Sequence, residues 1–309
     1  ISLEGIYRTP LMSPMTYGTS RIAYGQVEGE GRLLINLSAS SKSDRAGQRH
    51  QYSKQITLRA SDGEPMSVYT GPSHSFDQRV IFDGTRFFNM ALGDVGARGI
   101  SANVGKPKKV DRGGNSYSLV SNPMVYGAKG GRAQNGVPYQ QTFIRMGNVQ
   151  SGENGYPILF ATEKSSVISS RYNDSKNLAL IHVRKDFMDA PINAENHFDV
   201  KLVTSDKEKN PNFESQEHKV LFFATSALDK DGINPGMVWL TNYTDKASET
   251  VMKPKLVKIS GNLFVALWEK WTETDYVSTY AMVIDEYGNI VHPATDLGEV
   301  RLQRTDEVV

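Results

Sequence analysis

The sequence contains no cysteine and has almost no net charge, and both features exclude classes of function. Without cysteine, disulfides, thiolate metal sites, iron–sulfur clusters and cysteine nucleophiles are all excluded. The 35 Lys and Arg residues nearly balance the 34 Asp and Glu residues, for a formal net charge of +1. Such a balance gives no one-sided positive field to attract a phosphate backbone, so we expect no nucleic-acid partner.

The sequence also lacks any apolar run near the about 18–20 residues that a membrane-spanning helix needs, so we expect no membrane span. Hydrophobic residues still make up 39% of the chain, which is compatible with a sizeable core. A length of 309 residues suits roughly two average domains or one large repeat-built unit. Composition therefore indicates a globular chain without fixing its number of domains.

Helical periodicity is scarce, because no window of about 12 residues combines apolar positions at i, i+3, i+4 and i+7 with a helix cap. Short apolar or alternating segments recur instead, separated by Gly, Asn, Asp and Ser. The pattern predicts an all-β fold. The strongest predicted strands are Arg32–Ser38, Arg86–Leu92, Tyr156–Thr162, Lys219–Thr225 and Asn262–Trp271.

Each of these strands is followed by a second strand-like segment, as in a repeated meander. Their starts lie 43 to 70 residues apart, against about 40–50 residues for the blades of known propeller families. We therefore predict one β-propeller domain over residues 1–309, with about five to six four-stranded blades. A pair of β-sandwiches is the alternative. The second segments are Tyr52–Ala60, Ile100–Val104, Leu178–Arg184, Met237–Tyr243 and Val277–Asp285.

Turn signals and the two ends of the chain bear on how such a ring is built. Asp83 and Gly84 lie between apolar runs, which is a strong hairpin signal. The segments Ile1–Arg8 and Glu299–Val309 are both strand-like, and we expect them to combine into a closing blade that removes the exposed edge. The alternative is that the sequence is a segment of a longer protein.

Five polar residues bracket two predicted strands and form the main candidate binding site. Fixed Arg, Asp and His side chains at one end of an inner strand can hydrogen-bond the hydroxyls or the carboxylate of a sugar. The alternative is a structural network that caps turns and joins neighbouring blades. These candidates are His74, Asp77, Arg79, Asp94 and Arg98.

Two further groups are candidate ligand-binding residues. Trp268 and Trp271 are three apart, so on a strand their rings point to opposite faces, one toward the core and one toward solvent. The exposed ring can stack on a sugar or fill a partner's pocket, although packing between blades is the alternative. Asp229 and Asp231 precede a glycine and are candidate Ca²⁺ ligands, but they do not complete a calcium loop and also fit a hairpin turn. No other cofactor is expected.

Two stretches of the chain resemble a known kind of repeat. His74–Ile100, with its Asp-Gln-Arg sequence, Asp-Gly turn and Gly-Asp…Arg-Gly ending, is similar to the repeat unit of secreted bacterial multi-bladed β-propeller proteins, and so is Lys255–Val291. This resemblance implies a recognition module that is secreted or exposed at the cell surface. It provides no catalytic residues.

The functional prediction is a non-enzymatic, lectin-like recognition module that binds a glycan or a protein partner in adhesion or an extracellular assembly. The sequence has none of the motifs of serine esterases, zincins, P-loop proteins or dinucleotide-binding enzymes. A carbohydrate-active enzyme, either a glycoside hydrolase or a polysaccharide lyase, is the alternative. Its acidic residues in a central cleft would be placed by the fold and would leave no local motif.

Overall fold

All regular elements in the described part of the chain are strands, which confirms the all-β prediction. The structure is a computed structural model, and the residues that it describes are 20–40, 51–73, 75–93, 98–104, 124–128, 145–163, 175–185, 198–201, 219–222 and 237–302. They form four four-stranded sheets and one two-stranded sheet. Within these residues, no helix is long and apolar enough to cross a membrane.

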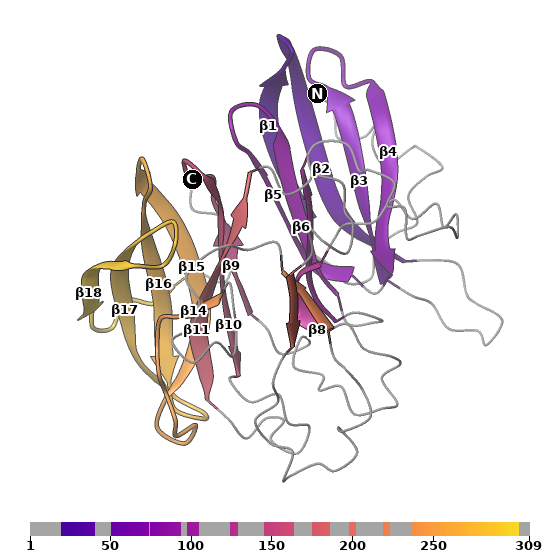
Figure 1. The fold of residues 1–309 in the computed structure, drawn as a ribbon. Helices are drawn as coiled ribbons and strands as arrows, with labels where there is room; N and C mark the ends of the chain where they lie inside the picture. The colour runs from indigo at the N-terminus through magenta and orange to yellow at the C-terminus, as the bar shows by residue number, and fades with distance from the viewer. Residues whose placement is uncertain are drawn as a thin grey trace, which may run out of the picture. The chain divides into compact units, whose positions relative to one another are not determined.

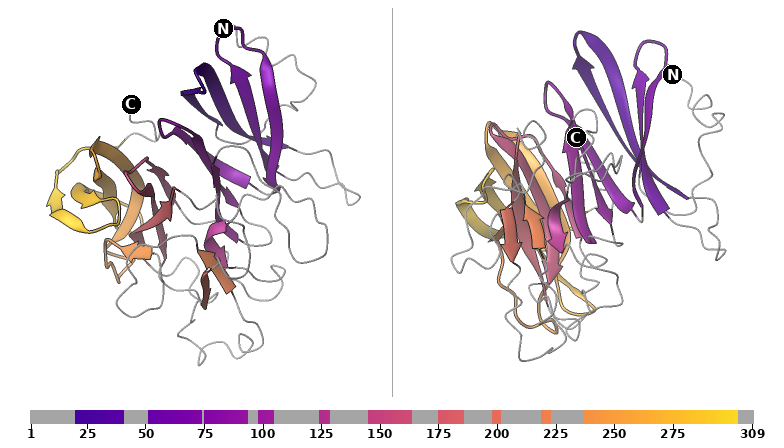
Figure 2. Two further views of the ribbon diagram at one scale, coloured as in Figure 1. Left: turned by 45° about the horizontal axis from the view of Figure 1, so that its top comes forward. Right: turned by 45° about the vertical axis from the view of Figure 1, so that its right-hand side comes forward.

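The chain divides into two compact units, which are described separately. Unit 1 contains Ile1–Val95 and Gly99–Met124, and unit 2 contains Gly96–Arg98 and Val125–Val309. The first sheet of unit 1 is an antiparallel meander whose strands run side by side in chain order (Figures 1 and 2). Its strands are β1 (Ser20–Val27), β2 (Glu30–Ser40), β3 (Gln51–Arg59) and β4 (Pro65–Ser73).

The second sheet is again antiparallel where its pairing is described, and its strands β5, β6, β7 and β8 also follow chain order. Strand β5 packs on β1, β2 and β3 of the first sheet. The approach is close at Gly25, where an added Cβ would collide with the Phe82 ring. The strands are β5 (Ser75–Phe82), β6 (Phe87–Gly93), β7 (Arg98–Val104) and β8 (Met124–Ala128).

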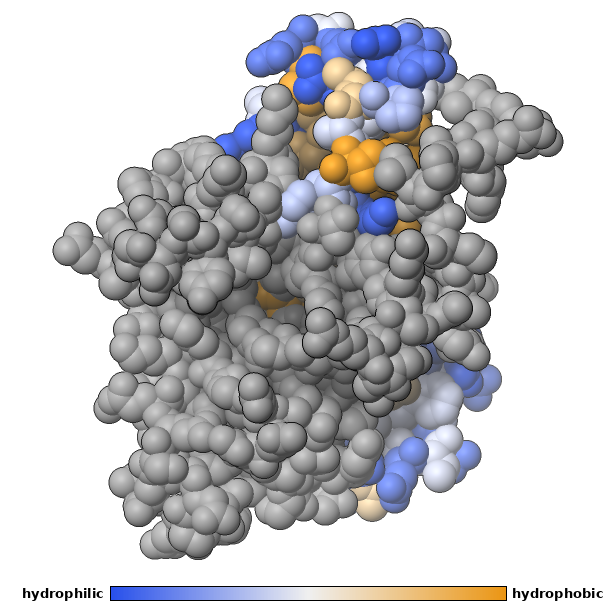
Figure 3. All heavy atoms as spheres, turned by 90° about the vertical axis from the view of Figure 1, so that its right-hand side faces the viewer, coloured by the Kyte–Doolittle hydropathy of each residue, from blue (hydrophilic) through white to orange (hydrophobic). Residues whose placement is uncertain are grey.

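Alternation along β2 divides the apolar residues of unit 1 between two faces. Leu34 points to the face that packs against Val80 and Phe87 of β5 and β6. Ile35 and Leu37 point to the opposite face and cluster with apolar residues of β3. Both faces are therefore apolar near the middle of the strand, which explains why this segment reads as a continuous apolar run. At the end of the first sheet that lies at the top of Figure 3, hydrophilic side chains surround a smaller hydrophobic area.

Unit 2 contains two four-stranded sheets, with order β14-β11-β10-β9 and β15-β16-β17-β18, and a hairpin of β12 and β13. Large apolar side chains from both four-stranded sheets form one buried core. The strands are β9 (Arg145–Val149), β10 (Gly155–Glu163), β11 (Lys176–Arg184), β12 (Phe198–Lys201), β13 (Lys219–Phe222), β14 (Met237–Trp239), β15 (Thr250–Ser260), β16 (Leu263–Trp271), β17 (Tyr276–Asp285) and β18 (Ile290–Asp296).

One predicted pairing is wrong. Strand β14 was expected to follow Lys219–Thr225 as its partner, but it pairs with β11 instead, and β13 pairs with β12. The Asn177 side chain explains this pairing, because its Oδ1 accepts hydrogen bonds from the Tyr243 amide at 2.6 Å and the Thr241 hydroxyl at 3.0 Å. These bonds hold the segment after β14 against the start of β11, 64 and 66 residues earlier in the sequence.

The predicted strands correspond to β2, β6, β10, β13 and β16, as far as these are described. Four of them, β2, β6, β10 and β16, are inner strands of four-stranded sheets, whereas β13 pairs with β12 in a two-stranded sheet. The terminal residues that were expected to form a closing blade lie mostly outside the described residues. Those that are described, 299–302, are not in a strand.

Candidate functional site

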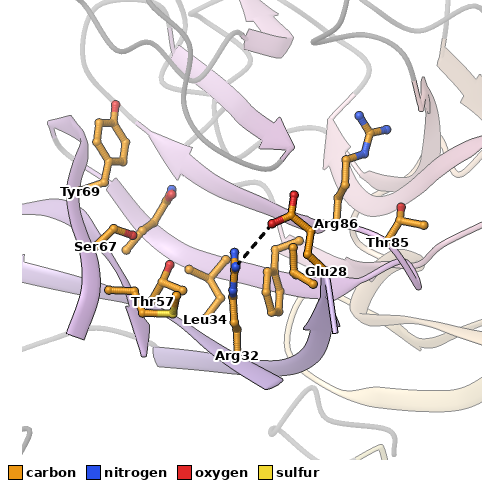
Figure 4. A pocket seen from close by; sticks show the side chains of 12 residues that line it. Glu28, Arg32, Leu34, Thr57, Ser67, Tyr69, Thr85 and Arg86 are labelled. Atoms are coloured by element: carbon orange, nitrogen blue, oxygen red, sulfur yellow. Dashed lines mark ion pairs between the residues drawn. The ribbon is translucent and has the colours of Figure 1, made fainter. Parts of the chain in front are cut away.

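A pocket of about 340 Å³ opens on the first sheet of unit 1, beside the turn between β5 and β6 (Figure 4). Its volume is at the small end of the range of about 300–1,000 Å³ that is typical of ligand pockets. The lining combines charged groups, hydroxyls and an amide with apolar side chains. The lining residues are Val27, Glu28, Arg32, Leu34, Gln55, Thr57, Met66, Ser67, Tyr69, Thr85, Arg86 and Phe87.

The antiparallel register places the polar lining on one face of the sheet. Thr57 of β3 is paired with Leu34 of β2 and with Ser67 of β4. At the next pair on the same face, two residues along β3, Gln55 is paired with Tyr69 of β4. Because side chains alternate between faces along a strand, the residues of these pairs point to the same side. A row of hydrogen-bonding groups therefore follows the pocket from β3 to β4.

The turn between β1 and β2 places a carboxylate at the rim. Glu28 and Gly29 form a two-residue hairpin turn with φ values of 55° and 80°. Turns of this kind need positive φ at both central residues, which glycine adopts easily and glutamate does not. The Glu28 side chain is 88% exposed, and its Oε2 lies 3.9 Å from Arg32 Nη2. A strained residue at a pocket rim is a common feature of functional sites.

The opposite wall is the turn between β5 and β6, where the predicted Asp-Gly hairpin is confirmed. Asp83 Oδ1 accepts hydrogen bonds from the backbone amides of Thr85 at 2.8 Å and Arg86 at 2.6 Å. Gly84 has a φ of 99°, a value that favours glycine. The aspartate thus fixes the backbone of the two residues whose side chains line this wall.

The inner end of the pocket contains a buried amide and a phenol. Gln55 is buried, and its Nε2 donates a hydrogen bond to Asn89 Oδ1 of β6, so the orientation of the amide is fixed. Burial raises the pKa of the Tyr69 phenol to about 12. Tyr69 is therefore protonated at neutral pH and can donate a hydrogen bond to an oxygen atom of a ligand.

The structure describes only part of the predicted polar site. Arg79 is buried in β5, with 2% of its side chain exposed, and it pairs with Asp77 and with the Gln78 carbonyl at 2.9 Å. Asp77 has a φ of 58° where the β5–β6 register shifts. This Asp–Arg pair fits the structural alternative. His74, Asp94, and the side chain of Arg98 lie outside the described residues.

The two tryptophans differ in exposure, as expected. Trp268 is 1% exposed and belongs to the core of unit 2. Trp271 is partly exposed, but the Arg301 guanidinium lies over its ring at 5.1 Å. The proposed Ca²⁺ ligands Asp229 and Asp231 lie outside the described residues. Among the residues that are described, no group of three or more His, Asp or Glu side chains could hold a metal ion.

A buried acid and histidine lie together in unit 2. His182 Nε2 of β11 is 3.6 Å from Glu286 Oε2, which follows β17. Both residues are buried, and Glu286 also accepts a hydrogen bond from the Asn154 side chain at 2.6 Å. Burial lowers the pKa of His182, so the ring is neutral at neutral pH. The pair is enclosed, and it links the two sheets of unit 2.

This arrangement depends on a glycine, which gives a stability prediction. A Cβ at Gly155 would overlap both the His182 ring and the Val183 carbonyl. We expect Gly155→Ala to destabilise the protein by about 1–3 kcal/mol, because the backbone carbonyl cannot move aside cheaply. Urea unfolding followed by circular dichroism measures the effect. Ser151→Ala, in the preceding loop, is the control and should stay within about 0.5 kcal/mol of wild type.

None of the pocket residues was predicted from the sequence as a binding residue. Glu28 and Gly29 between two apolar runs are the local signal that could have indicated the hairpin. Gln55, Ser67 and Tyr69 carry no local signal, because only the register of three strands brings them together.

The chain matches no family model and no curated protein. Among solved structures, it is similar to an endo-arabinase from Bacteroides thetaiotaomicron, with 12% identity and a TM-score of 0.33 over 88% of this chain and 78% of that one. It is also similar to an alpha-L-arabinofuranosidase from Lactobacillus brevis, with 8% identity and a TM-score of 0.33 over 87% of this chain and 74% of that one.

These comparisons correct the main functional prediction. A non-enzymatic recognition module was expected, whereas the similar solved structures are an endo-arabinase and an alpha-L-arabinofuranosidase. The recognition-module interpretation is therefore withdrawn.

Proposed function

We propose that the chain is a carbohydrate-active enzyme that holds a sugar unit in the unit 1 pocket. The observation that carries the proposal is the lining itself, in which hydroxyl, amide and charged groups share a small pocket with apolar side chains. A sugar ring presents hydroxyls at its edge and C–H groups on its faces. Polar groups that converge in a mostly preformed pocket satisfy such a ligand in a fixed orientation.

Glu28 is the group that we propose for proton transfer. Hydrolysis of a glycosidic bond canonically uses two carboxyl groups, and one of them is the acid that protonates the leaving oxygen. Glu28 is the carboxylate among the described lining residues, and its backbone is held at the rim by the β1–β2 turn. Tyr69, protonated at neutral pH, lines the same pocket from β4 and serves to orient the sugar through a hydrogen bond.

The test is the release of new saccharide ends from a panel of neutral and acidic polysaccharides incubated with the full chain. We expect Glu28→Asn to lower the rate about 100-fold or more, as typical for loss of an acid–base group. Asparagine tolerates positive φ, so the turn and the stability of the protein are retained. Circular dichroism melting checks that the variant stays folded.

Glu273→Gln is the matched control, since it neutralises an exposed turn carboxylate of unit 2 whose side chain is 64% exposed. Its rate should equal that of the wild type. An equal rate for Glu28→Asn would exclude Glu28 from catalysis. Binding of glycans without any turnover across the panel would exclude the enzymatic proposal.

We further propose that the sheets are blades of a β-propeller, as the strand pattern predicts. Four sheets of four strands each, antiparallel wherever their pairing is described, support this, and three of them follow simple chain order. A crystal structure with the sheets around one axis is the expected result, and two stacked layers would contradict it. In keeping with the resemblance of two stretches of the chain to secreted bacterial propeller repeats, we also propose that the protein is secreted or at the cell surface, which fractionation of the source cells tests.

A further inference from the structure

The charged groups of the pocket are arranged with the cations inside and the carboxylate at the mouth. Arg32 and Arg86 are half-buried, whereas Glu28 is almost fully exposed. The two guanidinium groups come from different elements, β2 and the β5–β6 turn (Figure 4). A charge screened by solvent acts weakly at a distance, so the more buried cations dominate the electrostatic environment of a bound ligand.

Arg32 keeps donors for a ligand despite its ion pairs. Its Nε donates to Glu30 Oε2 at 3.1 Å, while its Nη2 is 3.9 Å from Glu28, beyond hydrogen-bonding distance. A guanidinium has five N–H donors in a planar fork. Glu30 also accepts a hydrogen bond from Arg59 at 3.1 Å, so its charge is shared between two arginines. The pair with Glu30 thus orients Arg32, whose side chain lines the pocket.

The backbone of Arg86 is fixed by Asp83 in the β5–β6 turn, at the opposite wall of the pocket. Its amide donates to Asp83 Oδ1 and its carbonyl accepts from the Asp83 amide at 3.0 Å, so both backbone groups are fixed. Asp83 is itself occupied by donors of the turn, including the Thr85 hydroxyl at 2.8 Å. The turn therefore presents the Arg86 side chain to the pocket from a backbone that has little freedom.

We propose that the sugar bound in this pocket is acidic, and that Arg32 and Arg86 bind its carboxylate. This inference rests on the proposed carbohydrate function and names the substrate class. A planar carboxylate matches the fork of a guanidinium, and hydrogen bonds between two charged groups are stronger than those between neutral groups. The hydroxyls of Thr57, Ser67 and Thr85 then serve the ring hydroxyls of the same sugar.

The experiment compares binding of polymers that differ in the carboxyl group alone. Pectate, alginate and hyaluronan are each tested beside the carboxyl-reduced form of the same polymer, together with neutral arabinan and xylan, by titration calorimetry with the full chain. We expect at least one acidic polymer to bind, its reduced form to bind about 10-fold or more weakly, and added salt to weaken the acidic form.

Arg86→Gln separates the pocket from general charge attraction. This variant should lose about 10-fold or more in affinity for the acidic polymer, whereas Lys246→Gln, which removes a positive charge in unit 2, should bind as the wild type does. Equal binding of the acidic and the reduced forms, or binding of the neutral polymers alone, would overturn the acidic-sugar inference and leave the carbohydrate function standing. No binding of any polymer would overturn both.

Discussion

Replacing Trp268 by alanine is expected to destabilise the protein by about 3–5 kcal/mol, the cost of removing a large buried aromatic side chain. The indole is 1% exposed, stacks on the Tyr280 ring at 5.5 Å, and donates a hydrogen bond from Nε1 to the Tyr243 hydroxyl at 3.2 Å. Its loss leaves both a cavity and a buried hydroxyl with one partner fewer. Urea unfolding followed by far-UV circular dichroism measures the change.

Trp271→Ala is the matched control for this variant. The Trp271 ring is partly exposed at the end of β16, where the Arg301 guanidinium covers it. Removal of this ring exposes little new core, but it takes a hydrogen-bond donor from the buried Glu269 carboxylate. We therefore expect a loss of about 1.5–3 kcal/mol, the contribution of a hydrogen bond to a charged group, which is less than for Trp268→Ala. Similar losses for the two variants would show that Trp268 is not the residue that fills the core of unit 2.

The comparison of these tryptophans shows what sequence patterns can predict. Strand alternation predicted that residues three apart would point to opposite faces, and the structure places Trp268 in the core and Trp271 at the surface. Alternation does not predict what covers a surface residue. The Arg301 guanidinium reaches Trp271 from 30 positions away, so the availability of the ring for a sugar could not be inferred locally.

The positions of the strands could be predicted because they too depend on local sequence patterns. Apolar runs mark buried strands wherever they occur, and the Asp83 and Gly84 turn was predicted because its chemistry is local. Strand pairing was predictable only between neighbours in sequence. The pairing of β11 with β14 joins Leu180 to Val238 across a long connection, and no local pattern specifies that choice.

The pocket was the least predictable part. Glu28 and Gly29 resemble many surface turns, and Gln55 resembles any polar residue of a strand. Their common role follows from register, since Gln55 and Tyr69 face each other only because β3 and β4 pair with a bulge at each end. In contrast, the conspicuous Arg79 is buried and bonded to Asp77. The charged residues that stand out in the sequence thus form a structural ion pair, and the residues that line the pocket were not among the predicted binding residues.

Glu269 is a second buried charge with a structural role, and it explains how the segment after β18 is held. The carboxylate is fully buried, yet it accepts hydrogen bonds from Lys253 at 3.0 Å, from the Trp271 indole at 2.8 Å and from the Leu302 amide at 2.8 Å. Burial alone would raise the pKa of Glu269. The hydrogen bonds from Trp271, Lys253 and Leu302 outweigh it and lower the pKa below its ordinary value.

We expect Glu269→Gln to lower the free energy of unfolding at pH 7 by about 2–4 kcal/mol, somewhat less than for a fully enclosed pair, because Lys253 and Arg301 keep access to water. The effect depends on pH with a definite sign. The unfolded carboxyl takes up a proton near pH 4.3, before the folded one does, so the contribution of Glu269 is complete above that pH and decreases as the pH falls toward the lower, folded-state pKa. The difference in unfolding free energy between wild type and variant should therefore narrow below about pH 4.3.

Glu273→Gln, which neutralises an exposed glutamate, should show no such difference at any pH. A gap that widens in acid would mean that the folded-state pKa of Glu269 is raised, and that its hydrogen bonds do not compensate for burial.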